Sequence, residues 1–127
     1  MAKICPRGFQ PEDLEKPTPL LHLLYTQNIL QGRWKLLILD FLAKGPQRFS
    51  QLQRHLGNLS QGSLTKQLKE MEADGLLQKE IYPQVPPRVD YQLTHKGRDL
   101  LPILELMVAY GQAHMPAVED RENNQRP

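Results

Sequence analysis

The sequence predicts a mainly α-helical domain that contains one small β-hairpin. Four stretches between residues 19 and 74 place their apolar residues at helical spacing and are separated by glycine or proline. After Gly75 the spacing changes to the alternation of strands, and a last apolar stretch after Thr94 returns to helical spacing. A chain of 127 residues is long enough for one such domain with its own core.

Charge is unevenly distributed along the chain. The net charge is +2, but residues 33–98 carry eleven basic and six acidic side chains, a balance of +5, whereas residues 99–127 carry −3. A basic middle segment indicates a face for an anionic partner. The apolar runs are shorter than the roughly 20 residues that cross a bilayer. We therefore expect a cytoplasmic protein without a membrane partner.

The two ends of the chain are expected to lie outside the folded domain. Residues 1–18 are rich in proline and poor in large apolar side chains, which predicts a flexible arm. Residues 114–127 are mostly polar and are expected to form a tail. The domain itself is expected to span residues 19–113.

Capping and breaking residues delimit the first two helices. Thr18 before Pro19 is a favourable start for a helix that runs to about Gln31. Gly45 ends the next helix. That helix carries apolar residues at i, i+3, i+4, i+7 and i+8, which predicts one packed face made of Trp34, Leu37, Ile38, Phe41 and Leu42.

Two further helices follow, the first of them short. Ser50 and Gln53 fit a capping box at the start of the first. Ser60 is expected to cap the second, which spans about residues 60–74. The apolar residues expected to face inward on this helix are Leu64, Leu68 and Met71.

A hairpin and a last helix complete the pattern. Extended segments within residues 76–94 are joined by a proline-rich loop, and Thr94 starts a helix of about residues 95–112 that Pro102 kinks or splits. Helices joined by a tight turn and followed by a hairpin describe a winged helix-turn-helix, a fold that binds DNA. In this fold helix 60–74 enters the major groove and the hairpin, or wing, lies at the minor groove.

The outward side of helix 60–74 has the polar, slender residues that a major groove admits. Those expected at DNA are Ser60, Gln61, Gly62, Ser63, Thr65, Lys66 and Lys69. Cations near other helix starts are candidate phosphate contacts, namely Arg33, Lys35, Arg48 and Arg54. On the wing, Arg88 is expected either to enter a narrowed minor groove or to bind a phosphate. The alternative for all of these residues is an ordinary solvated surface.

The last helix carries more apolar residues than one small core would cover, which predicts a homodimer. The first helix is expected to contribute to the same interface. The expected interface residues are Leu20, Leu21, Leu24, Leu104, Met107, Val108 and Tyr110.

The sequence offers little chemistry for catalysis. Its four histidines lack the i, i+4 spacing of helical metal ligands, and one cysteine cannot found a zinc site by itself. We expect a protein that is not an enzyme and that needs no metal or cofactor. The alternative to a DNA-binding regulator is a winged-helix module that binds another protein.

Several runs together resemble the HxlR-type bacterial transcription regulators, which are relatives of the MarR group. They are GRWKLLIL from Gly32, RFSQL from Arg48, LTKQLKEMEADGL from Leu64 and YPQVPPRVDYQLT from Tyr82. The resemblance implies a homodimer that binds palindromic operator DNA and controls transcription. It also implies that Ser60, Thr65 and Leu68 belong to the recognition helix and that Arg88 is the wing arginine.

Some members of that family sense oxidants through a cysteine that stands just before the first helix. Cys5 is followed by proline in a similar way, but about fourteen residues separate it from the expected helix start. An unreactive thiol on a mobile arm is the favoured alternative. The resemblance leaves open a small-molecule or oxidant effector.

Overall fold

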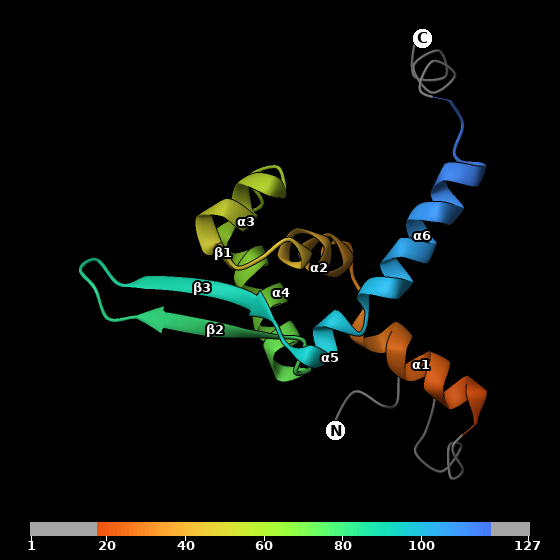
Figure 1. Ribbon diagram of the computed structural model, residues 1–127, viewed down its shortest axis with the longest axis horizontal. Coiled ribbons are helices and arrows are strands. Elements are labelled where there is room, and N and C mark those ends of the chain that lie inside the picture. Colours follow the sequence, from red (N-terminus) through yellow and green to blue (C-terminus); the bar gives the residue numbers. More distant parts are fainter. Residues whose placement is uncertain (1–17, 118–127) are drawn as a thin grey trace.

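The computed structural model describes residues 18–117 (Figure 1). Within this range it confirms a mostly helical winged helix-turn-helix with a small antiparallel sheet. The elements in chain order are α1 (Pro19–Ile29), α2 (Lys35–Ala43), β1 (Gln47–Arg48), α3 (Phe49–His55), α4 (Gln61–Ala73), β2 (Leu77–Tyr82), β3 (Arg88–Leu93), α5 (His95–Arg98) and α6 (Leu101–His114).

The core lies between α2, α3, α4 and the base of the sheet. Its largest fully buried side chains are Ile38, Leu39, Leu42, Leu52, Leu64, Leu68, Met71 and Leu76. Leu64, Leu68 and Met71 therefore face inward on α4, as predicted. On α2 the predicted face is wrong at one position, because Leu37 is exposed and Leu39 is buried in its place.

Side-chain hydrogen bonds fix the starts of α1 and α3. The Thr18 hydroxyl accepts a hydrogen bond from the Leu21 amide at 3.2 Å, as the sequence predicts. Helix α3 starts earlier than predicted, and it is Gln51 that reaches back to accept from the Arg48 amide at 2.9 Å. The predicted box of Ser50 and Gln53 is therefore wrong. Gln53 instead donates to the Leu59 carbonyl, across the turn between α3 and α4.

The sheet has three strands in the order β1-β3-β2, one more than the predicted hairpin. Six residue pairs join β2 to β3, from Leu77 with Leu93 to Tyr82 with Arg88. Strand β1 adds two pairs on the other edge of β3, Gln47 with Tyr91 and Arg48 with Asp90. Strand β1 therefore connects the start of α3 to the hairpin of β2 and β3, which is the wing.

The chain leaves the sheet through a close contact at Gly97. Thr94 caps α5 by accepting from the Gly97 amide at 3.1 Å, and its own amide donates to the Leu76 carbonyl. A Cβ atom at Gly97 would lie 2.1 Å from that carbonyl oxygen, so this position requires glycine. Pro102 stands in the first turn of α6, and the predicted last helix is split into α5 and α6.

Lys96 of α5 connects α1 to the end of α4. Its Nζ donates to the Tyr25 hydroxyl at 2.6 Å and to the Asp74 carbonyl at 2.8 Å. Asp74 is the residue that follows the last turn of α4. Helices α1 and α6 extend away from the rest of the fold, on the side opposite the wing (Figure 1). Among the described helices, none combines the length and apolarity needed to cross a membrane.

Candidate nucleic-acid interface

Helix α4 is buried on one side and open to solvent on the other. Leu64, Leu68 and Met71 are at most 1% exposed. The opposite side exposes Gln61, Gly62, Lys66 and Lys69, with Ser63 and Thr65 half-buried beside them. This is the arrangement that a helix in a major groove requires, because the open side presents only polar or slender groups.

The first turn of α4 is held by its own cap. The Ser60 Oγ accepts from the Ser63 amide at 3.2 Å and donates to the Ser63 hydroxyl at 2.9 Å. Around Gly62 a Cβ atom would meet no other group within 4 Å. An exposed glycine inside a helix destabilises it relative to alanine, so the fold does not account for this glycine. A close approach of another molecule to the backbone would account for it.

The structure contradicts the predicted phosphate contact of Lys35. The residue is 3% exposed, and its Nζ lies 2.6 Å from the Glu70 carboxylate of α4. A lysine that is buried and paired in this way does not reach a phosphate. Its contact instead connects the first turn of α2 to α4.

The other predicted cations of the helices remain at the surface. Arg33 is exposed, and its guanidinium lies 5.0 Å from the centre of the Trp34 ring. Arg48 and Arg54 are exposed at the start and in the last turn of α3. Each of the three is accessible to a phosphate, and their role at DNA stays a prediction.

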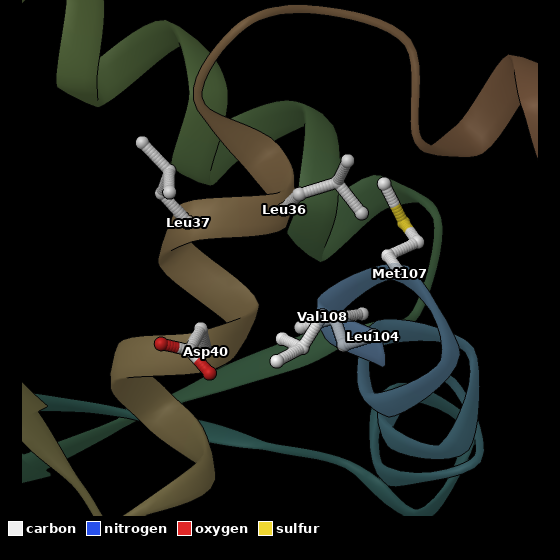
Figure 2. A pocket seen from close by; sticks show the side chains of 6 residues that line it. All are labelled: Leu36, Leu37, Asp40, Leu104, Met107 and Val108. Atoms are coloured by element: carbon white, nitrogen blue, oxygen red, sulfur yellow. The ribbon is translucent and has the colours of Figure 1, made fainter. Parts of the chain in front are cut away.

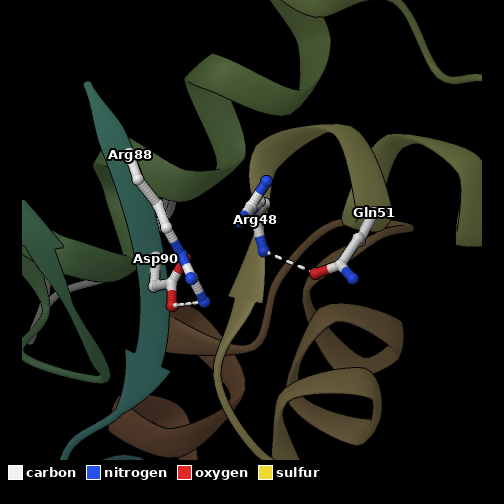
Figure 3. Close-up of polar contacts among 4 residues, drawn as sticks. All are labelled: Arg48, Gln51, Arg88 and Asp90. Carbon is white, nitrogen blue, oxygen red and sulfur yellow. Dashed lines mark hydrogen bonds and ion pairs between the residues drawn. The ribbon is translucent and has the colours of Figure 1, made fainter. Parts of the chain in front are cut away.

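Arg88 is bound to the wing itself. Its Nε and Nη2 donate to the two carboxylate oxygens of Asp90 at 3.1 and 3.0 Å (Figure 3). Its guanidinium also lies 5.1 Å from the centre of the Tyr82 ring. The hydrogen bond to Asp90 is the main reason why the pKa of Arg88 is raised above its ordinary value. Sequence reasoning missed Asp90, although its position two residues after Arg88 on a strand puts both side chains on one face.

The loop of the wing is exposed and apolar. Residues 83–87 contain three prolines, and the Val85 side chain is 99% exposed. This tip extends past Arg88, which stands at the first position of β3.

Five of the seven predicted dimer residues are accessible to a partner. Leu20, Met107, Val108 and Tyr110 are exposed, and Leu21 is half-buried. The other two are mostly covered within a single chain, since Leu24 is 8% and Leu104 9% exposed, and their place at an interface stays a prediction. Three further apolar residues of these helices are also exposed, namely Leu23, Ile103 and Leu106.

A shallow groove of about 260 Å³ runs between α2 and α6 (Figure 2). Its lining is apolar except for one carboxylate, and it comprises Leu36, Leu37, Asp40, Leu104, Met107 and Val108. Met107 and Val108 belong both to this groove and to the exposed apolar side of α6. The groove and that side therefore form one continuous surface. Cys5, the predicted redox residue, lies outside the described residues.

Comparisons with known proteins agree with the fold. A family model described as HxlR-like helix-turn-helix matches residues 29–119. The HTH-type transcriptional regulator BH0655 from Halalkalibacterium halodurans is 48% identical over 88 residues, which are 68% of this chain and 78% of the relative. The HTH-type transcriptional regulator YtcD from Bacillus subtilis is 40% identical over 105 residues, which are 83% of each chain.

A solved structure shares both the fold and part of the sequence. The redox regulator HypR in its oxidised form superposes with a TM-score of 0.70 and 36% identity, over 76% of this chain and 99% of HypR. These relatives are regulators of transcription and not enzymes.

Proposed function

The chain belongs to the HxlR-like helix-turn-helix family, and from this premise we propose that it binds palindromic operator DNA as a homodimer. It is a transcriptional regulator with a helix-turn-helix DNA-binding fold. In the proposed complex α4 lies in the major groove, and the wing of β2, β3 and their loop lies against the adjacent minor groove.

The observation that carries the proposal is the asymmetry of α4. Its inner side is closed by Leu64, Leu68 and Met71, so its outer side is held at the surface in a fixed orientation. That outer side presents two lysines and an exposed glycine, with the amides of the first helical turn beside them. Lysines and helix N-termini attract phosphates, whereas side chains such as Gln61 and Thr65 have the donors and acceptors that read base edges.

The dimer is supported by the apolar surface of α1 and α6. Leu106 is 71% and Tyr110 69% exposed, and the groove between α2 and α6 continues this surface. A second copy of the chain would cover these side chains through a self-complementary contact. The two copies of α4 would then be about 34–36 Å apart, one turn of B-DNA.

Selection of DNA fragments from a genomic library at physiological salt tests the proposal. We expect fragments that contain an inverted repeat, bound by a species with twice the mass of one chain. The affinity should fall steeply as salt rises, because neutralised phosphates release their counterions. Binding without sequence preference or salt dependence would contradict the proposal, and it would favour a module that contacts protein.

Redox control by this chain would depend on Cys5, the one cysteine in its 127 residues. HypR is described as a redox regulator, which motivates the test. If Cys5 acts as a sensor, diamide should change the operator affinity of the unchanged chain but not that of Cys5→Ser, because an oxidised product requires the thiolate. Equal responses of the two chains would exclude a role for Cys5.

A further inference from the structure

One face of the wing gathers charged side chains next to the loop. Asp90 of β3 is paired in register with Arg48 of β1 and with Glu80 of β2, and Arg88 is paired with Tyr82. Paired residues on neighbouring strands, and residues two apart on one strand, direct their side chains to the same face. These five residues form the wing cluster.

Asp90 is the buried member of this cluster. It is 4% exposed, and both of its carboxylate oxygens accept hydrogen bonds from Arg88. The Arg88 side chain is 39% exposed, and Tyr82 lies against its guanidinium. Arg88 is therefore fixed on one side by Asp90 and is open to solvent on another. The pair uses two of the five N–H groups of the guanidinium.

The stability of the fold does not by itself explain the ion pair of Arg88 with Asp90. Taking a carboxylate out of water is unfavourable, and apolar residues of similar size often replace a buried ion pair without loss. What the pair provides is orientation, because a bidentate contact fixes the plane of the guanidinium. A fixed guanidinium loses less conformational entropy when it binds a phosphate than a freely rotating one.

We propose that Asp90 is a positioning residue for DNA binding, which holds Arg88 so that its remaining N–H groups contact a backbone phosphate beside the wing. The inference rests on the proposed function and adds a residue that does not itself touch DNA. Charge alone would not select an aspartate here, since a carboxylate near DNA repels phosphates.

The same geometry places Arg88 at the DNA backbone and not inside the minor groove. A side chain that enters the groove must extend away from its strand, whereas Arg88 is bound along its strand by Asp90. The loop of residues 83–87, with Val85 at 99% exposure, is the part of the wing that is free to approach the groove. Arg88→Ala should therefore weaken binding to all DNA sequences alike, because phosphates carry no direct sequence information.

Asp90→Asn tests the proposal, because the two explanations predict opposite changes in DNA affinity. The substitution keeps the shape of the side chain and removes a negative charge, so long-range electrostatics would tighten DNA binding. If Asp90 positions Arg88, the variant should instead bind the selected operator fragment about tenfold more weakly. The slope of log affinity against log salt should become shallower by about 0.9, the value for one lost phosphate contact.

Asp99→Asn is the matched control. It makes the same Asp-to-Asn change at an exposed residue outside the wing cluster, whose carboxylate lies 3.7 Å from His95. We expect this variant to bind the operator fragment at least as tightly as the unchanged chain.

A double-mutant cycle separates positioning from a loss of folding. Asp90→Asn should add less than a twofold loss of affinity in the Arg88→Ala background, because its effect passes through Arg88. All variants are compared with the operator fragment and with a scrambled fragment of equal length, at a temperature where circular dichroism shows each to be folded. A general loosening of the wing would lower affinity further in the double variant.

The outcomes distinguish this inference from the proposed function. Tighter or unchanged binding by Asp90→Asn overturns the inference, as do fully additive losses in the cycle. A change of sequence preference in Arg88→Ala overturns the phosphate assignment. If the unchanged chain shows no salt-dependent binding to any selected fragment, the proposed function fails, and the inference fails with it.

Discussion

Helices α4 and α6 use their apolar residues in opposite ways. The apolar residues of α4 are its inner side, and Leu64, Leu68 and Met71 are at most 1% exposed. Of the larger apolar set on α6, Leu104 is buried, whereas Leu106, Met107, Val108 and Tyr110 are exposed. The core around α4 is thus complete within one chain, whereas α6 presents an exposed apolar surface that the proposed dimer would cover. In that proposal stability and assembly depend on different helices, so substitutions should affect them separately.

The largest expected effect is on the buried apolar side of α4. Leu68→Ala should lower the free energy of unfolding by about 3 kcal/mol, because it leaves a cavity among side chains that cannot close around it. Chemical denaturation followed by circular dichroism measures the change. The loss should persist at every protein concentration. A loss that disappears at high concentration would show that the core depends on assembly.

The second prediction concerns the exposed apolar side of α6. Val108→Glu should leave the helical content of the chain unchanged and weaken the dimer about hundredfold, since an unpaired charge would be buried at the interface. Sedimentation equilibrium measures the dissociation constant. Gln112→Glu adds the same charge to an exposed polar position of α6 and should have a much smaller effect. Equal effects of the two variants would place the interface elsewhere.

A third prediction compares Lys66, which is exposed on α4, with Lys35, which is buried beside it on α2. Lys66→Gln should make the salt dependence of DNA binding shallower by about 0.9 in log–log slope, because an exposed phosphate contact is removed. Lys35→Met should leave the slope unchanged, since Lys35 is paired with Glu70 inside the fold. Salt titrations of operator binding measure both. A shallower slope for Lys35→Met would show that Lys35 does contact a DNA phosphate.

The smallest expected effect on stability is at Gly62. Gly62→Ala should stabilise the chain by about 0.5–1 kcal/mol, because the added methyl group has open space and alanine favours the helix. The same variant should bind operator DNA more weakly if the backbone approaches the groove there. Thermal unfolding and binding titration are measured on the same preparation. Unchanged affinity would remove Gly62 from the interface.

Local signals in the sequence predict much of the fold. Thr18 and Thr94 cap helices where the sequence places them, and Pro102 separates α5 from α6. These features depend on residues that are near one another in the chain. Strand β1 was missed because two residues, Gln47 and Arg48, are too few to show a strand pattern, and their pairing partners lie more than 40 residues later.

The site was less predictable than the fold because it depends on distant partners. Lys35 stands near a helix start, where the sequence suggests an exposed cation. Only the packing of α2 on α4 reveals its contact with Glu70. The count of apolar residues on α1 and α6 correctly indicated an excess, but it could not show that Leu24 and Leu104 are covered by their own chain. By contrast, the pairing of Arg88 with Asp90 could have been inferred from the alternation of a strand.

The contacts of Lys96 have a consequence for how far apart two binding sites on DNA can stand. One ammonium group connects Tyr25 on α1 to the carbonyl that closes α4. In a dimer joined through α1 and α6, the angle between these helices and α4 determines the distance between the two reading helices. Since Lys96 joins α1 to the end of α4, a small rotation at this contact would change the half-site spacing that the proposed dimer fits.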